Sequence, residues 1–173
     1  MTVLWHTSED DSIQRFEPRA NPEHDSDEAF VWAIDAEHMP AYWFPRDCPR
    51  GTFWAVAETS GEDVERFLLG DPSLRVHLVQ TNWLAAMRST RVVAYRLPPE
   101  TFTPYGRAAG YWVSRKPVAP LDLVELGDLL DKHAEAGIEL RIVPKLWPVW
   151  QEVIGSTLGF SGIRLRNLDS RSN

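Results

Sequence analysis

The sequence has a single cysteine, Cys48, among its 173 residues. One cysteine cannot form an intrachain disulfide, so stability is expected to come from a hydrophobic core, which a chain with 43% hydrophobic residues can supply. The sequence also lacks a basic and apolar leader, and it has no apolar run long enough to cross a membrane. These absences predict a cytoplasmic protein with no membrane partner.

Several cofactor and metal motifs are missing as well. The sequence contains no GxGxxG, no GxxxxGK[ST] and no cluster of cysteine and histidine at metal-binding spacing. The absence of these patterns disfavours a Rossmann domain, a P-loop and a structural zinc site. We therefore expect no bound metal.

Positive charge is also scarce. Lysine and arginine number 18 against 25 aspartates and glutamates, which gives a formal charge of −7. Eight of the acids lie within residues 1–30, beside Arg15 and Arg19 alone. Binding of duplex nucleic acid relies on many contacts from lysine and arginine to phosphate. That partner is therefore disfavoured, and any nucleotide ligand is expected to be small.

Short apolar runs and turn signals follow one another along the chain without a repeat and without a sustained βαβ rhythm. We expect strands near residues 3–6, 30–34, 52–57, 75–80, 91–97, 111–114, 138–143 and 160–166. We expect helices that begin near Ser60, Asn82, Asp122 and Pro148. The predicted fold is α+β, a single domain over residues 1–173 with mixed or antiparallel sheets and about four helices. Residues 17–28 are expected to form a polar loop and residues 168–173 a flexible tail.

The expected core takes the apolar face of each element. The side chains predicted to be largely buried are Trp32, Phe53, Trp54, Val76, Leu78, Val93, Leu126, Leu130, Leu140, Ile142 and Trp150. Trp147 is expected to join this core, and Glu139 and Arg141 are expected on a solvated face of their strand.

The stretch with the most evident chemistry is FVWAIDAEHMPAYWFPRDCPR, at residues 30–50. It carries Tyr42 in a short helical segment, followed by a loop in which Arg46 and Arg50 flank Cys48. Arginine forks onto phosphate or carboxylate and aromatic rings stack on bases, so this combination predicts a pocket for a flat, anionic, nucleotide-like ligand. Alternatives stay open: the arginines could bridge the acidic first segment, and Cys48 could be an activated thiol, although an inert buried thiol is expected.

Three segments carry a resemblance to known proteins: LWHTSEDDSIQRFEPR at residues 4–19, VWAIDAEHMPAYWFPRDCPR at residues 31–50, and YWVSRKPVAPLDLVEL at residues 111–126 with the later GIELRIV. With these segments the chain resembles, over nearly its whole length, a bacterial family of uncharacterised proteins, the domain of unknown function 6886. Their order is also similar to that of the ADP-ribosyltransferase fold. That fold has a first strand ending in histidine and a hydroxyl residue, an Ala-Tyr helix after a Val-Trp-Ala strand, and a later strand with Tyr, Val and Ser.

The second resemblance implies roles for individual residues. It places His6 and Thr7 where that fold grips the nicotinamide ribose of NAD, and Tyr42 where an aromatic ring stacks on nicotinamide. His6 is the candidate catalytic residue, with a structural, hydrogen-bonded histidine as its alternative. Transferases of this fold usually carry a glutamate near the later strand. Residues 109–114 contain no acid, so Glu139 or another acid would have to supply it.

Two functions from different classes follow from these expectations. The first is an enzyme of the ADP-ribosyltransferase type, or one that cleaves an NAD or ADP-ribose linkage, with NAD as the implied cofactor. In it His6 orients the ribose, and Arg46 or Arg50 holds the pyrophosphate. The second is a non-catalytic protein that binds a nucleotide or small anion through the same residues, Thr7, Tyr42 and the two arginines. The missing acid favours the second function or a different chemistry, and the sequence leaves open whether the chain is an enzyme.

Overall fold

The computed structural model describes residues 2–20, 28–106 and 110–168. The chain separates into two compact units, each built from two segments of the sequence. The first unit comprises Met1–Trp43 and Arg91–Gly127, and the second comprises Phe44–Thr90 and Asp128–Asn173. Across the described residues, the expectation of an α+β chain with four α-helices and mixed or antiparallel sheets is confirmed. The single domain over residues 1–173 stays a prediction beside this division.

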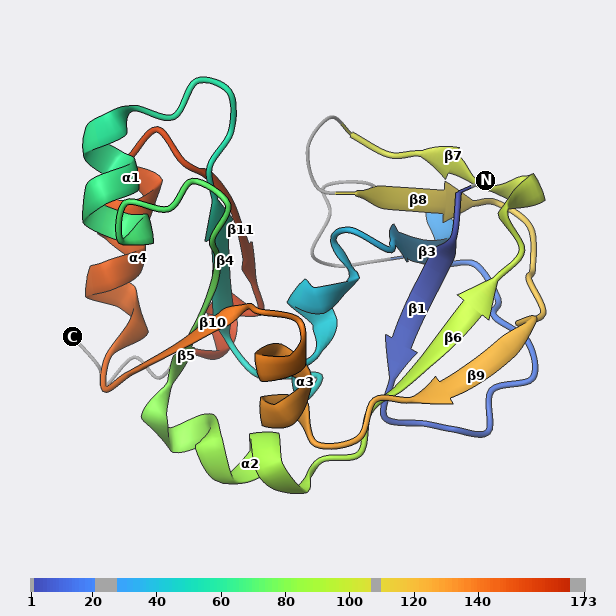
Figure 1. The fold of residues 1–173 in the computed structure, drawn as a ribbon. Helices are drawn as coiled ribbons and strands as arrows, with labels where there is room; N and C mark the ends of the chain where they lie inside the picture. Colours follow the sequence, from blue (N-terminus) through green and yellow to red (C-terminus); the bar gives the residue numbers. More distant parts are fainter. Residues whose placement is uncertain (1, 21–27, 107–109, 169–173) are drawn as a thin grey trace. The chain divides into compact units, whose positions relative to one another are not determined.

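The first unit is built on an antiparallel sheet of seven strands (Figure 1). Its strands are β1 (Leu4–Ser8), β2 (Arg19–Ala20), β3 (Ala29–Asp35), β6 (Val93–Leu97), β7 (Thr103–Pro104), β8 (Tyr111–Ser114) and β9 (Asp122–Glu125), and short 3-10 helices span Met39–Tyr42 and Pro99–Thr101. The order across the sheet is β7-β8-β3-β1-β6-β9, and β2 pairs with β3. The first strand and the strand predicted at residues 30–34 are therefore neighbours, with Leu4 opposite Asp35.

One face of this sheet carries the core of the first unit. The buried side chains of that core are Leu4, Phe16, Val31, Ala33, Val93, Tyr95, Leu97, Phe102 and Val118. Side chains two residues apart in a strand share a face, so Asp35 follows Val31 and Ala33 in the same phase. The alternation along β3 thus sets a carboxylate at the rim of the core, where the strand ends.

The second unit has a mixed sheet of four strands in the order β10-β5-β4-β11, in which β10 and β5 are parallel. Its strands are β4 (Arg50–Trp54), β5 (Arg75–Gln80), β10 (Glu139–Val143) and β11 (Gly159–Ile163). Its helices are α1 (Gly61–Leu68), α2 (Leu84–Ser89), α3 (Leu129–Glu135) and α4 (Leu146–Ile154), with 3-10 turns at Thr81–Trp83 and Leu165–Asn167. Helices α1 and α4 cover one face of this sheet, and α3 lies on the other (Figure 1). None of the described helices is both long and apolar enough to cross a membrane.

Most of the predicted core is found in the interior. The fully buried members are Phe53, Val76, Leu78, Val93, Leu126 and Trp150, and the half-buried ones are Trp32, Trp54, Leu130 and Leu140. Two predictions are wrong, because Ile142 is 40% exposed and Trp147 is 39% exposed.

The error at Ile142 comes from the phase of β10. The guanidinium of Arg141 lies 5.6 Å from the centre of the Phe53 ring and donates to the Phe67 carbonyl at 3.1 Å. Arg141 therefore lies on the core face of the strand, where its stem and planar head cover apolar rings, and Ile142 takes the opposite face of an edge strand. Glu139 and Arg141 are both half-buried and 2.8 Å apart, so the predicted solvated face is also wrong.

The stretch predicted as one helix from Asp122 to Gly137 is a strand followed by a helix. Residues 122–125 form β9 at the edge of the first sheet, and Gly127 then adopts a φ of +73°. The N-cap of α3 is Asp128, whose carboxylate accepts from the two amides that follow Leu129, at 2.8 and 3.2 Å. The capping signal expected at Asp122 lies six residues later.

The polar segments at 17–28 and 168–173 are described only in part. Residues 19–20 form β2, in which Arg19 stands opposite Phe30, so this piece of the predicted loop is a strand. Residues 21–27 and 169–173 lie outside the described residues.

Candidate functional site

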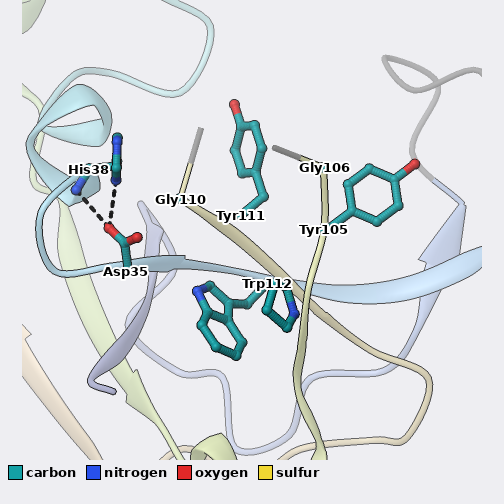
Figure 2. Close-up of a pocket in the computed structure, with 8 residues that line it drawn as sticks. Asp35, His38, Tyr105, Gly106, Gly110, Tyr111 and Trp112 are labelled. Carbon is teal, nitrogen blue, oxygen red and sulfur yellow. Dashed lines mark hydrogen bonds and ion pairs between the residues drawn. The ribbon is translucent and has the colours of Figure 1, made fainter. Parts of the chain in front are cut away.

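A pocket of about 260 Å³ lies in the first unit, where β3 ends and β8 begins (Figure 2). It is lined by Asp35, His38, Pro104, Tyr105, Gly106, Gly110, Tyr111 and Trp112. The pocket thus brings a carboxylate and an imidazole from the end of β3 beside aromatic residues from β8 and the chain after β7. Nowhere in the described part of the chain do three or more His, Cys, Asp or Glu side chains gather in a way that could hold a metal ion.

Asp35 and His38 are joined through the turn that follows β3. Asp35 Oδ1 accepts a hydrogen bond from the His38 backbone amide at 2.9 Å and another from His38 Nδ1 at 2.8 Å (Figure 2). Aspartate commonly holds a turn in this way. In the neutral imidazole this arrangement puts the proton on Nδ1 and the lone pair on Nε2. The side chains are 26% and 19% exposed, respectively, so a molecule in the pocket can reach both.

Gly110 precedes β8 and lies against the side chains of Asp35 and His38, where only a glycine leaves enough space. Its φ is +66°, a conformation that L side chains rarely adopt, and a Cβ there would lie 2.4 Å from His38 Nδ1 and 2.7 Å from Asp35 Oδ2. The Asp35 amide also donates to the Gly110 carbonyl at 2.9 Å. Glycine at this position therefore makes the space that the pair occupies.

Aromatic rings form another side of the pocket. Tyr105 and Tyr111 both pack edge-on against Trp32, with ring centroids 4.9 and 6.0 Å from the indole. The Tyr42 hydroxyl donates to the Tyr111 hydroxyl at 2.9 Å. Of the residues that the sequence predicted, Tyr42 is thus brought into contact with a residue that lines the pocket.

His6 makes the contacts of a structural histidine. Its Nδ1 donates to the Trp32 carbonyl at 2.8 Å, and its ring packs on Phe16 with centroids 4.7 Å apart. It is not among the described residues that line the pocket. The catalytic role of His6 stays a prediction, and these contacts are those expected of its alternative.

Thr7 is half-buried in β1, opposite Ala94 of β6. Because β1 and β3 are antiparallel, the end of β3 that leads to Tyr42 lies beside Leu4. His6 and Thr7 follow Leu4 along β1 and so lie farther from that end.

Arg46 and Arg50 belong to the second unit. Arg50 is 2% exposed, donates from Nη1 to the Cys48 carbonyl at 3.0 Å, and lies 5.3 Å from the centre of the Phe44 ring. Arg46 is exposed, and its carbonyl accepts from Arg164 Nε at 3.2 Å. Arg50 therefore holds its own loop from the interior of the unit. The binding of a ligand by these two arginines stays a prediction.

The sequence reading missed Asp35, His38 and most of the aromatic lining. Glu139, considered as the replacement acid, pairs with Arg141 in the second unit, whereas the carboxylate of the pocket comes from Asp35. A usable signal existed, because Asp-x-x-His directly after an apolar strand lets the aspartate hold both the turn and the imidazole. Tyr105 gave no such signal, since only the pairing of the strands brings it beside β3.

Cys48 is fully buried, and this burial raises the pKa of its thiol to about 12, against the opposing effect of Arg50. We expect iodoacetamide to alkylate Cys48 in the native protein roughly a thousandfold more slowly than a free cysteine at pH 8, because the thiolate fraction falls by about that factor. Mass spectrometry with and without urea measures this rate. Rapid modification of the folded protein would contradict the expectation, and Cys48→Ser should leave ligand binding unchanged.

Comparison with known proteins gives a family. The sequence model of a family of unknown function (DUF6886) matches residues 5–168. No curated protein and no solved structure matches the chain, so the likeness to the ADP-ribosyltransferase fold stays a prediction. Because the family match takes in both units and nearly the whole sequence, the chain belongs to the DUF6886 family.

Proposed function

We propose that the protein binds a nucleotide-like ligand, such as NAD or ADP-ribose, by its nucleoside part in the pocket of the first unit. The observation that carries the proposal is the Asp35–His38 pair beside the half-buried rings of Tyr105 and Tyr111. Every base has a flat π face, and stacking on an aromatic side chain contributes ~1–3 kcal/mol per base. The two tyrosines are candidates for that contact.

Recognition of the sugar would come from Asp35. Both hydrogen bonds from His38 end on Oδ1, which leaves Oδ2 to accept from a ligand hydroxyl. Hydrogen bonds to a charged group contribute about 1.5–3 kcal/mol each. A nucleoside offers a flat ring and neighbouring hydroxyls in one molecule, so it matches both parts of the pocket.

The second candidate is an enzyme that cleaves an NAD or ADP-ribose linkage, and the geometry of His38 favours it. A carboxylate bound to one imidazole nitrogen fixes the tautomer and orients the other nitrogen as a general base. Asp35 is placed in this way on Nδ1, so Nε2 can take a proton from a hydroxyl or a water molecule. The non-catalytic alternative needs His38 only as a hydrogen-bonding group.

The binding test starts with thermal-shift screening of NAD, ADP-ribose, mononucleotides and small phosphorylated metabolites, followed by calorimetry of the best hit. Tyr111→Ala should weaken binding at least ~10-fold, because one stacking contact is lost. Trp147→Ala, which removes an exposed ring of the second unit, is the matched control and should bind as the wild type does. Arg46→Ala in the same titration tests the predicted phosphate contact. No hit, or equal affinities for wild type and Tyr111→Ala, would refute the proposed site.

His38→Gln separates the two candidates. Glutamine retains hydrogen bonding but cannot act as a base, so its affinity should stay within about threefold of wild type while any turnover falls roughly 100-fold or more. Chromatography of NAD and ADP-ribose after long incubation measures turnover. Tight binding without any product from the wild type would establish the non-catalytic alternative.

A further inference from the structure

Two histidines form a buried pair inside the second unit. His77 of β5 and His133 of α3 are 0% and 1% exposed. His77 Nδ1 lies 2.9 Å from His133 Nε2, and His133 Nδ1 lies 2.6 Å from the Leu129 carbonyl. The Phe44 ring packs against both imidazoles, with centroids 5.7 and 5.0 Å away. The pair therefore links α3 to the sheet in apolar surroundings.

The carbonyl at one end fixes the hydrogen-bond directions of the pair. A carbonyl can only accept, so His133 Nδ1 carries a proton, and the neutral ring then has its lone pair on Nε2. His77 must donate to that lone pair from Nδ1. His77 Nε2 is left as an acceptor, and it is buried without a hydrogen-bond partner in the described residues. An additional proton would go to His77 Nε2, where it would find no acceptor.

The charges nearest the pair oppose a further positive charge. Burial is the main reason that the pKa of His77 lies well below its ordinary value, and His133, Arg75 and Arg50 lower that pKa further. Burial also lowers the pKa of His133, against the effect of its bond to the Leu129 carbonyl. Among the described groups that shift these two pKa values, none is a carboxylate. A protonated imidazole here would be a buried cation without a counter-ion.

Other charged side chains on the surrounding elements are ion-paired or accessible to solvent. On β10, Glu139 is bound to Arg141. The charged residues of α2, α3 and the 44–49 segment are exposed or half-buried, and they are Arg46, Asp47, Arg88, Asp128, Asp131, Lys132 and Glu135. A proton added to the pair would therefore find no carboxylate counter-ion among the groups that shift the two pKa values.

We propose that the His77–His133 pair is an acid-sensitive latch, in which uptake of a proton by either imidazole releases α3 from the sheet and loosens the second unit. The sign follows from linkage. Folding lowers both pKa values, so the unfolded chain binds more protons than the folded one. The contribution of the neutral pair to the free energy of unfolding is therefore fully present above the unfolded pKa of 6.5, and it is lost as the pH falls below that value. A buried histidine that stays neutral should lower the folding equilibrium constant about tenfold between pH 7.5 and 5.5. Aspartates and glutamates titrate lower, near pH 4.

Urea unfolding at pH 7.5 and 5.5, followed by tryptophan fluorescence, tests the latch. The folding equilibrium constant of the wild type should fall about 10- to 100-fold between these pH values, the upper figure applying if both rings contribute. In the apolar variant His77→Phe/His133→Leu the fall should be at least tenfold smaller. His38→Gln, which removes a histidine of the first unit, is the matched control and should keep the wild-type response. A wild type that is insensitive to pH, or a double variant as sensitive as the wild type, would overturn the proposal.

A second measurement needs only the wild-type protein, so it tests the latch even if the double variant fails to fold. The ¹⁵N shifts of the imidazoles in the wild-type protein report the protonation of each ring directly. Both rings should keep the neutral pattern with Nδ1 protonated until the signals of the second unit are lost. Titration of either ring near pH 6.5 with the fold intact would be incompatible with the latch.

Discussion

Replacement of Gly110 by alanine should weaken ligand binding in the pocket of the first unit. The backbone cost of a left-handed conformation for a non-glycine residue is about 1–2 kcal/mol. The new Cβ would also lie 2.4 Å from His38 Nδ1 and 2.7 Å from Asp35 Oδ2, so it would displace the carboxylate oxygen that is proposed to accept from the ligand hydroxyl. The chain cannot easily shift to relieve the contact, because the Asp35 amide binds the Gly110 carbonyl. We expect at least ~10-fold weaker binding by calorimetry, the cost of one charge-assisted hydrogen bond.

Gly127→Ala is the matched control for this substitution. Gly127 lies in the same unit with a φ of +73°, and a Cβ there meets nothing within 4 Å. Gly127→Ala therefore has the cost of a left-handed backbone conformation but no steric clash of the new Cβ with a neighbouring side chain. Wild-type affinity in Gly110→Ala would show that the Asp35–His38 pair does not define the site. Equal losses in both variants would instead assign the effect to general destabilisation of the unit.

The pocket takes Asp35 and His38 from the stretch at residues 30–50, whereas Tyr42, Arg46 and Arg50 were the residues predicted there from the sequence, and their ligand contacts stay predictions. Tyr42 contacts the lining of the pocket because its hydroxyl donates to the Tyr111 hydroxyl, and its aromatic character was visible in the sequence. Asp35 and His38 were passed over because their value depends on the strand ending at Asp35, a boundary that composition alone does not fix. His6 entered through the resemblance to the ADP-ribosyltransferase fold, and its distance from the end of β3 follows from the antiparallel pairing of β1 with β3, two segments that are far apart in the sequence.

In the fold too, the features that depend on neighbouring residues were predicted, and those that depend on pairing between distant segments were not. Local chemistry predicted most strands and the cap at Ser60, whose side chain accepts from the Asp63 amide at 3.2 Å. It failed at residues 122–125, where a leucine-rich run with helical spacing pairs with β6 as an edge strand, because tertiary pairing overrode helix propensity. It failed again at Ile142, where an arginine took the core face of β10.

Trp150→Ala should be the most damaging single substitution proposed for the second unit. Trp150 is 2% exposed, and its ring lies over Gly51 and Gly162, which face each other across β4 and β11. A Cβ at Gly51 would lie 2.5 Å from the indole, and one at Gly162 would lie 2.9 Å from it. The two glycines thus form the floor on which the ring packs, and no neighbouring side chain from that floor can fill the space once the ring is removed. We expect a loss of ~3–5 kcal/mol in the free energy of unfolding, measured by urea denaturation.

Two further variants make this expectation specific to the contact. Trp147→Ala changes the same residue type on the same helix at a 39% exposed position, and it should cost less than about 1 kcal/mol. Gly51→Ala should destabilise the wild type by about 1–3 kcal/mol, because the added methyl group displaces the indole. In the Trp150→Ala background the same methyl group enters vacant space, so Gly51→Ala should be neutral or stabilising there, since alanine is less flexible than glycine in the unfolded chain. Additive losses in the double variant would show that the indole does not rest on Gly51, because residues in contact couple by about 0.5–3 kcal/mol.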